Sequence, residues 1–121
     1  MNNPLSNLVN KQFELVHWKG MNGTVYEFQI HPIGTEYFPK PGVYIVCRNL
    51  GNGSFSSIYV GETDNFKRRL TDELHSHHSI DGIRGHGATH ICTLHVPGSL
   101  SNRLLIETDL RNSLKPPCNK Q

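Results

Sequence analysis

Two runs of β-prone residues, 43–47 and 57–63, lie on either side of a segment that is rich in Gly, Asn and Ser. This order predicts an antiparallel hairpin. With the turn at Gly51-Asn52, Tyr44 pairs with Tyr59, and both phenols project from the same face of the sheet. A cross-strand aromatic pair also serves stability alone, since it contributes about 0.2–1 kcal/mol. The pattern therefore places two tyrosines side by side without assigning them a function.

A helix is predicted directly after this hairpin. Phe66, Leu70 and Leu74 repeat at helical spacing, and either Thr63 or Asp64 can cap the helix at its N-terminus. The apolar stripe formed by the three repeating residues is expected to pack on the sheet.

Three cations occupy the first turns of this helix, where positive charge opposes the helix dipole. They are Lys67, Arg68 and Arg69. Cations in this place suggest contact with phosphate groups. Lys67 and Arg68 lie on the open side of the helix, whereas Arg69 lies at the edge of the apolar stripe and can point along the surface that carries the tyrosines.

The rest of the chain predicts a second hairpin, a loop and a further strand. Residues 13–19 and 24–30 read as two strands around the turn residues 20–23, and a linking loop follows them. Residues 75–87 are rich in Gly, Ser and His and predict a loop. Residues 88–96 predict a strand with one face formed by His90, Cys92, Leu94 and Val96.

A last helix is predicted over residues 99–114, and it contains a carboxylate among apolar positions. The apolar stripe of this helix centres near 320° on the helical wheel when Leu100 is the reference, and Glu107 lies at about 340°. A carboxylate in such a stripe is costly unless it is paired or binds a metal. Glu107 is therefore a candidate metal ligand, and the alternative is a buried salt bridge, for example to Arg69.

The length and charge of the chain restrict its class. The 121 residues fit one domain with one ordinary core. The net charge of +2 comes from residues 41–121, because residues 1–40 balance three lysines against three glutamates. This modest surplus argues against tight, non-specific binding to nucleic acid.

The three cysteines are widely spaced and form no C-x-x-C pair, which argues against a disulfide framework and a thiolate zinc site. The N-terminus does not resemble a signal peptide, and no apolar stretch approaches the length of a membrane span. We therefore expect a cytoplasmic protein without membrane contact.

The histidines of the loop 75–87 leave two alternatives open. His75, His77 and His78 lie close together in the sequence and could bind zinc, although their spacing is irregular. The same imidazoles could instead contact phosphate or take part in proton transfer, because they follow a basic helix.

Five elements in this order and spacing together resemble the GIY-YIG nuclease superfamily, which includes intron homing endonucleases and the N-terminal nuclease of bacterial excision repair. Each element alone would be a weak signal. The elements are Gly42-Val43-Tyr44, Tyr59-Val60-Gly61, Arg69, Glu107, and Asn119 after Pro116-Pro117. The resemblance covers residues 42–119.

The resemblance implies an α+β fold with a small, mainly antiparallel sheet flanked by helices. It divides the chain into a flexible tail (1–12), a β-hairpin extension (13–40) and a nuclease-like domain (41–121). The implied activity is metal-dependent endonucleolytic hydrolysis of phosphodiester bonds in DNA. The alternative is a catalytically weak nucleic-acid-binding or protein-binding module on the same fold, and the oligomeric state stays open.

The resemblance also implies roles for residues of this chain. Glu107 would hold Mg²⁺ or Mn²⁺, with no small-molecule cofactor, and Arg69 would neutralise charge on the phosphate. The tyrosines would orient and activate water, and the side chain of Asn119 would support the site together with the two motif glycines, Gly42 and Gly61. Lys67 and Arg68 would contact flanking phosphates.

One position departs from the superfamily pattern. The superfamily often has histidine or tyrosine four residues after the helical arginine, where this chain has Glu73. Glu73 can pair with Arg69, and the general base stays open among Tyr44, Glu73 and His75. Tyr44 is favoured only if its neighbours lower its pKa, because a free phenol is a poor base at neutral pH.

Overall fold

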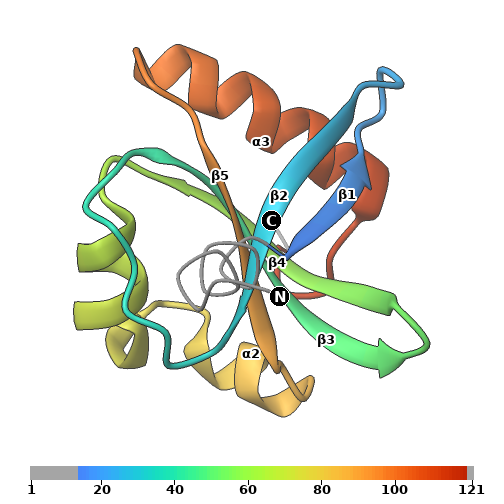
Figure 1. Ribbon diagram of the computed structural model, residues 1–121, viewed down its shortest axis with the longest axis vertical. Helices are drawn as coiled ribbons and strands as arrows, with labels where there is room; N and C mark the ends of the chain where they lie inside the picture. Colours follow the sequence, from blue (N-terminus) through green and yellow to red (C-terminus); the bar gives the residue numbers. More distant parts are fainter. Residues whose placement is uncertain (1–13, 120–121) are drawn as a thin grey trace, which may run out of the picture.

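The computed structural model describes residues 14–119, which form a five-stranded antiparallel sheet with helices on both faces (Figure 1). The spatial order of the strands is β1 (Leu15–Lys19), β2 (Val25–Pro32), β5 (His90–His95), β3 (Gly42–Gly51) and β4 (Ser54–Thr63). The helices are η1 (Lys67–Asp72), η2 (Leu74–Ser76), α2 (Ile80–Gly85) and α3 (Leu100–Leu114). This α+β architecture confirms the predicted fold class. The predicted tail, 1–12, and the first residue of the predicted strand 13–19 lie outside the described residues.

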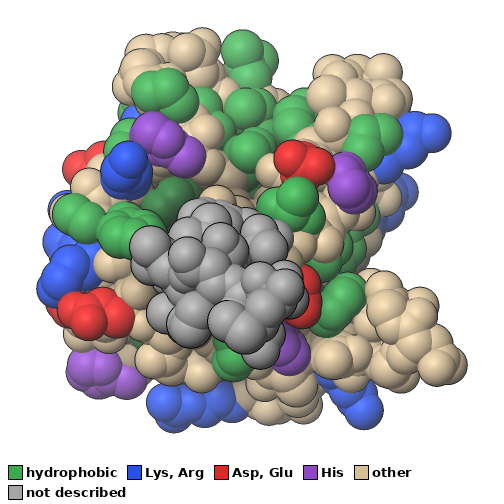
Figure 2. Space-filling model, viewed as in Figure 1, with side chains coloured by type: hydrophobic (Ala, Val, Ile, Leu, Met, Phe, Trp, Pro, Cys, Tyr) green, Lys and Arg blue, Asp and Glu red, His purple; other side chains and the backbone are tan. Residues whose placement is uncertain are grey.

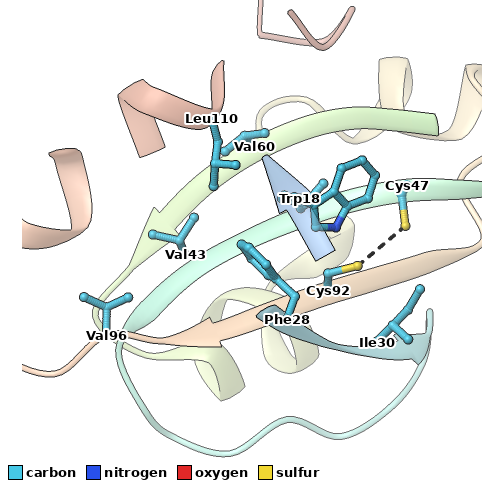
Figure 3. Close-up of a cluster of buried hydrophobic side chains, with 10 residues drawn as sticks. Trp18, Phe28, Ile30, Val43, Cys47, Val60, Cys92, Val96 and Leu110 are labelled. Atoms are coloured by element: carbon cyan, nitrogen blue, oxygen red, sulfur yellow. Dashed lines mark hydrogen bonds between the residues drawn. The ribbon is translucent and has the colours of Figure 1, made fainter. Parts of the chain in front are cut away.

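Strand β3 lies between β5 and β4 and is buried on both faces from Gly42 to Cys47. One face of the sheet packs on α3 through a cluster that includes Phe28, Ile45 and Leu110 (Figure 3). Cys47 and Cys92 lie in this cluster as free thiols with their sulfurs 3.9 Å apart.

The opposite face of the sheet carries the tyrosines. Its cluster joins Tyr44 and Tyr59 to Leu70 of η1 and Ile83 of α2. Two hydrophobic layers therefore sandwich the sheet, and the tyrosines belong to the layer under the short helices. Among residues 14–119, no helix is long and apolar enough to cross a membrane.

The predicted hairpin 43–63 is confirmed, but its register is different. Tyr44 lies opposite Gly61 and Tyr59 lies opposite Val46, so Tyr44 and Tyr59 are not direct partners. The shift is two residues, and a shift of two keeps side chains on the same face. The two phenol rings are therefore diagonal neighbours, with their centroids 6.0 Å apart.

The turn of this hairpin explains the register. Its central residues are Asn52 and Gly53, not Gly51 and Asn52, and their φ angles are 54° and 77°. Positive φ at both central residues is the requirement of the tight hairpin turn that Asn-Gly sequences favour. Irregularities on the strands, one of them between Val46 and Cys47, then adjust the pairing.

The predicted helix after the hairpin exists as two short pieces, neither of which is an α-helix. Element η1 is a π-helix in which the Glu73 N–H donates to the Arg68 carbonyl at 2.9 Å, and η2 is a 3₁₀ turn. The predicted caps are wrong, because the side chain of Asn65 accepts from the Arg68 N–H at 3.0 Å. Thr63 instead accepts from the Asn65 N–H.

The predicted loop 75–87 contains regular structure. Helix α2 lies within it, and the buried side chain of Ile83 anchors this helix on the sheet. Because glycines and histidines surround Ile83 in the sequence, no apolar periodicity there indicates a helix.

Helix α3 confirms the predicted last helix but buries a different stripe. Leu100 and Leu104 are 51% and 42% exposed, whereas Arg103 and Leu110 are buried. Arg103 is buried because its guanidinium donates to the Glu62 carboxylate at 2.8 Å. Glu107 consequently lies half-buried at the edge of the stripe and not at its centre.

The N-terminal hairpin, β1 and β2, extends the same sheet, because β2 pairs with β5. Its turn is fastened to α3 by Asp109. The Asp109 carboxylate accepts from the Asn22 N–H at 2.9 Å and from the Tyr26 hydroxyl at 2.7 Å. Gly20 is required at this contact, because a Cβ there would collide with the Asp109 side chain.

We predict that Asp109→Ala lowers the free energy of unfolding by about 1–3 kcal/mol, because it leaves the Tyr26 hydroxyl and the Asn22 N–H without their acceptor. Urea unfolding followed by circular dichroism measures this. The control is Thr108→Ala at the exposed neighbouring position, which should change stability little. Equal stability of the two variants would show that the hairpin does not depend on Asp109.

Candidate active site

The diagonal tyrosines depend on a glycine in the opposite strand. A Cβ on Gly61 would lie 2.5 Å from the Cζ and Oη atoms of Tyr44, closer than real atoms approach. Glycine at this position therefore lets the Tyr44 ring lie flat across β4. Gly42 is required for a different close contact, because a Cβ there would collide with the Leu94 carbonyl and the Phe66 ring.

His77 meets Tyr44 inside the protein. Its side chain is buried, and its Nε2 atom lies 2.9 Å from the Tyr44 hydroxyl. Its Nδ1 atom accepts from the Ser79 N–H at 3.0 Å. The ring stands nearly perpendicular to the rings of both Tyr44 and Tyr59, with interplanar angles of 87° and 88°.

His78 connects Tyr59 to Arg69. Its Nε2 atom lies 3.2 Å from the Tyr59 hydroxyl, and its Nδ1 atom accepts from the Arg69 guanidinium at 3.1 Å. The imidazoles of His77 and His78 stack with their centroids 4.6 Å apart. Two tyrosines, two histidines and one arginine thus form one connected cluster, which we call the Tyr-His cluster.

Sequence reasoning grouped His77 and His78 with the other loop histidines and did not place them at the tyrosines. Their position after a basic helix was the available signal. Of the other proton-transfer candidates, His75 is exposed, and Glu73 lies 3.9 Å from Arg68 and not beside Arg69. The structure therefore brings neither of these two candidates into the cluster.

Arg69 points differently from its two basic neighbours. Arg68 forms an ion pair with Asp64, and Lys67 forms one with Asp72 at 3.3 Å. Acidic side chains thus compensate the two cations on the open side of η1, whereas the Arg69 guanidinium contacts His78.

Glu107 interacts electrostatically with both tyrosines. Burial chiefly raises the pKa of Tyr44 and the pKa of Tyr59, and the charge of Glu107 raises each further. Burial also raises the pKa of Glu107 itself, Arg111 lowers it, and Glu62 raises it. The predicted alternative, a salt bridge between Glu107 and Arg69, is wrong within the described residues, where the buried ion pair is Arg103–Glu62.

The donor set fits a hard divalent cation better than zinc. No group of three or more His, Cys, Asp or Glu side chains that could hold a metal occurs in residues 14–119. Mg²⁺ commonly takes one or two carboxylates and completes its shell with water and phosphate oxygens. The half-buried Glu107 carboxylate, with a raised pKa and another carboxylate nearby, is a site where a divalent cation would relieve unfavourable charge.

Asn119 fastens the C-terminal segment to β4 between Tyr59 and Gly61. Its side chain accepts from the Val60 N–H at 2.7 Å and donates to the Val60 carbonyl at 2.8 Å. An amide is required for this double contact, because it combines a donor and an acceptor in one plane. Asn119 thereby supports the strand from which Tyr59 projects.

The pKa shifts of the two tyrosines decide how well each phenol could serve as the general base. Tyr44 does not meet the condition for a free-standing base, because burial raises its pKa, and Arg69 offsets only part of that rise. For Tyr59, burial raises the pKa, whereas Arg69, Arg111 and the hydrogen bond with Tyr44 lower it.

We predict that His77 makes stability depend on pH. Burial, then the charges of Arg69 and His78, lower the pKa of His77 from 6.5 to about 4. Between these values the unfolded chain binds a proton that the folded chain does not, so stability falls as the pH falls through this window.

His77→Gln should remove this loss, which we place at no more than about 3 kcal/mol. Urea unfolding at pH 7 and pH 4.5 measures it, and His75→Gln at an exposed position is the matched control. An unchanged pH dependence in the His77 variant would show that another group causes the loss.

No protein family model matches the sequence, and no curated protein matches it. Three crystal structures match the fold with a TM-score of 0.55, at 26%, 25% and 25% sequence identity. Each match covers 69% of this chain and 87% of the other chain.

All three structures are point mutants of the GIY-YIG N-terminal endonuclease domain of UvrC from Thermotoga maritima, bound to its catalytic divalent cation. This similarity agrees with the antiparallel sheet and its covering helices. The chain has the fold of the GIY-YIG superfamily.

Proposed function

We propose that this chain is a metal-dependent endonuclease that hydrolyses phosphodiester bonds of DNA through a GIY-YIG active site. The observation that carries the proposal is the Tyr-His cluster, in which Arg69 is linked to Tyr59 through His78 and lowers the pKa of Tyr44 by a hydrogen bond and its charge, while the charge of Glu107 raises the pKa of both phenols. Similarity to an endonuclease domain bound to its catalytic divalent cation supports it. We also propose that residues 41–121 form the nuclease-like domain and residues 13–40 its hairpin extension.

Glu107 would hold the divalent cation, Mg²⁺ or Mn²⁺, which when bound supplies Lewis-acid stabilisation of charge on the phosphate. Arg69 would place its fixed positive charge at the phosphoryl oxygens, where negative charge grows in the transition state. Tyr44 and Tyr59 would hold the attacking water by their hydroxyls. Asn119, Gly42 and Gly61 would keep the strands in place for these contacts.

The proposal is tested with purified protein on circular single-stranded DNA, plasmid and branched DNA, with Mg²⁺ or Mn²⁺ and with chelator. Cleavage that needs the divalent ion would support it. Binding of DNA without cleavage of any of the three would contradict it and favour a binding module on the same fold.

We predict that Glu107→Gln lowers divalent-ion-dependent cleavage by about 10²-fold or more, because an amide does not replace the carboxylate as a cation ligand. The fold should stay intact. Since the pKa of Glu107 is raised in the folded chain, its charge destabilises that chain at neutral pH, and the variant should be as stable as wild type or slightly more stable. A marked fall in melting temperature would instead show a structural role for this carboxylate.

We predict different defects for Arg69→Ala and Arg68→Ala. Arg69→Ala should slow the single-turnover rate at saturating enzyme by about 10²-fold, because its charge is matched to the transition state. Lys67 and Arg68 would contact flanking phosphates, and each must first give up its acidic partners.

Arg68→Ala should therefore lower the salt slope of binding by less than about one unit and leave the saturated rate unchanged. Fluorescence anisotropy at several salt concentrations measures the slope. An unchanged saturated rate in Arg69→Ala would mean that Arg69 is only another phosphate contact.

A further inference from the structure

In both imidazoles of the Tyr-His cluster, the same ring nitrogen faces the same kind of hydrogen-bonding partner. In each, Nδ1 faces a group that can only donate a hydrogen bond, and Nε2 faces a tyrosine hydroxyl. A neutral imidazole has one protonated nitrogen and one that accepts, so the group at Nδ1 decides which nitrogen carries the proton.

At His77 the donor is the backbone N–H of Ser79, which lies 3.0 Å from Nδ1. This nitrogen must therefore be unprotonated, and the proton lies on Nε2. Nε2–H then donates to the Tyr44 hydroxyl at 2.9 Å. Because the imidazole is buried, it cannot exchange this partner for water.

At His78 the donor is the guanidinium of Arg69, 3.1 Å from Nδ1, and a guanidinium has no acceptor. In neutral His78 the proton again lies on Nε2, which donates to the Tyr59 hydroxyl at 3.2 Å. A chain of donors thus runs from Arg69 through His78 to Tyr59, and a second one runs from Ser79 through His77 to Tyr44.

We propose that His77 and His78 are positioning residues that donate to the two tyrosine oxygens and thereby direct both phenol protons away from the imidazoles, the Tyr44 proton toward Tyr59 and the Tyr59 proton toward the substrate site. This inference rests on the proposed nuclease function. A phenol whose oxygen accepts a hydrogen bond from a fixed donor must direct its own O–H to a different acceptor. The same hydrogen bond stabilises negative charge on the phenol oxygen.

The same geometry accounts for the departure at Glu73. The superfamily pattern often places a histidine or tyrosine one turn after the helical arginine, but Glu73 points to Arg68. In this chain the short turn η2 brings an imidazole back onto Arg69 from a position nine residues further along. The loop after η2 therefore supplies the aromatic donor that η1 lacks.

The first experiment measures the ring protons directly. Nitrogen-edited NMR of ¹⁵N-histidine-labelled wild-type protein at neutral pH distinguishes protonated from unprotonated ring nitrogens. We expect Nε2–H with unprotonated Nδ1 at both His77 and His78, assigned by comparison with the His77→Gln and His78→Gln spectra. The Nδ1–H form at either residue would overturn the proposal, whatever the activity of the protein.

The second experiment separates hydrogen-bond donation from proton transfer. Glutamine can donate and accept but does not ionise, whereas leucine fills similar space with neither function. His77→Leu should lower the single-turnover rate by about 10²-fold because Tyr44 loses its fixed donor, and His77→Gln should stay within about fivefold of wild type. The same order is expected for His78→Gln and His78→Ala.

The control is His17→Gln, at the far edge of the sheet from β3 and β4, which should not change the rate. Melting temperatures identify a variant that merely fails to fold. Equal loss in the glutamine and leucine variants of His77 would overturn the proposal in favour of a proton-transfer role. Absence of cleavage by wild-type protein would refute the proposed nuclease function alone, and the NMR result would then decide the placement of the protons.

Discussion

The close approach of Tyr44 to the backbone of Gly61 is the contact on which the candidate active site depends. Gly61 lies opposite Tyr44 in the sheet, and the phenol occupies the space that any other side chain would fill. Only with this space empty can the Tyr44 hydroxyl reach His77 while its ring stays beside Tyr59. The glycine is thus needed for close packing and not for an unusual backbone angle, and its absence of a side chain determines where both phenols lie.

A buried ion pair places the carboxylate on the other side of this site. Arg103 of α3 and Glu62 of β4 have side chains that are only 10% and 22% exposed, and their 2.8 Å contact fixes the rotation of α3 against the edge strand. Such a pair adds little net stability but penalises other arrangements, because separation would leave a buried charge alone. Glu107 lies one helical turn beyond Arg103, so the same pair fixes its position, where its charge raises the pKa of both phenols and Glu62 raises its own pKa.

Elements with strong local signals could be predicted from the sequence. The strands, the last helix and the common face of Tyr44 and Tyr59 followed from alternation and helical spacing, and a two-residue error in register did not change that face. The location of His77 could not be predicted, because its burial depends on long-range contacts with Tyr44 and Tyr59 that no periodicity signals. The stripe of α3 was misjudged for a similar reason, since Arg103 is buried only through a partner 41 residues away in the sequence.

The distribution of charge around η1 separates affinity from chemistry. Three consecutive cations suggest a broad phosphate-binding surface, but two of them, Lys67 and Arg68, form ion pairs with carboxylates of this chain. The third, Arg69, contacts an imidazole, so its field remains directed at the tyrosines. Of the three cations of η1, Arg69 is therefore the one whose charge no carboxylate of residues 14–119 compensates. A single fixed positive charge stabilises negative charge that develops on one reacting phosphate more than it stabilises the charge spread along a nucleic-acid backbone. Under the proposed function, we therefore expect a modest affinity for DNA, with the positive charge of Arg69 acting mainly on the reacting phosphate.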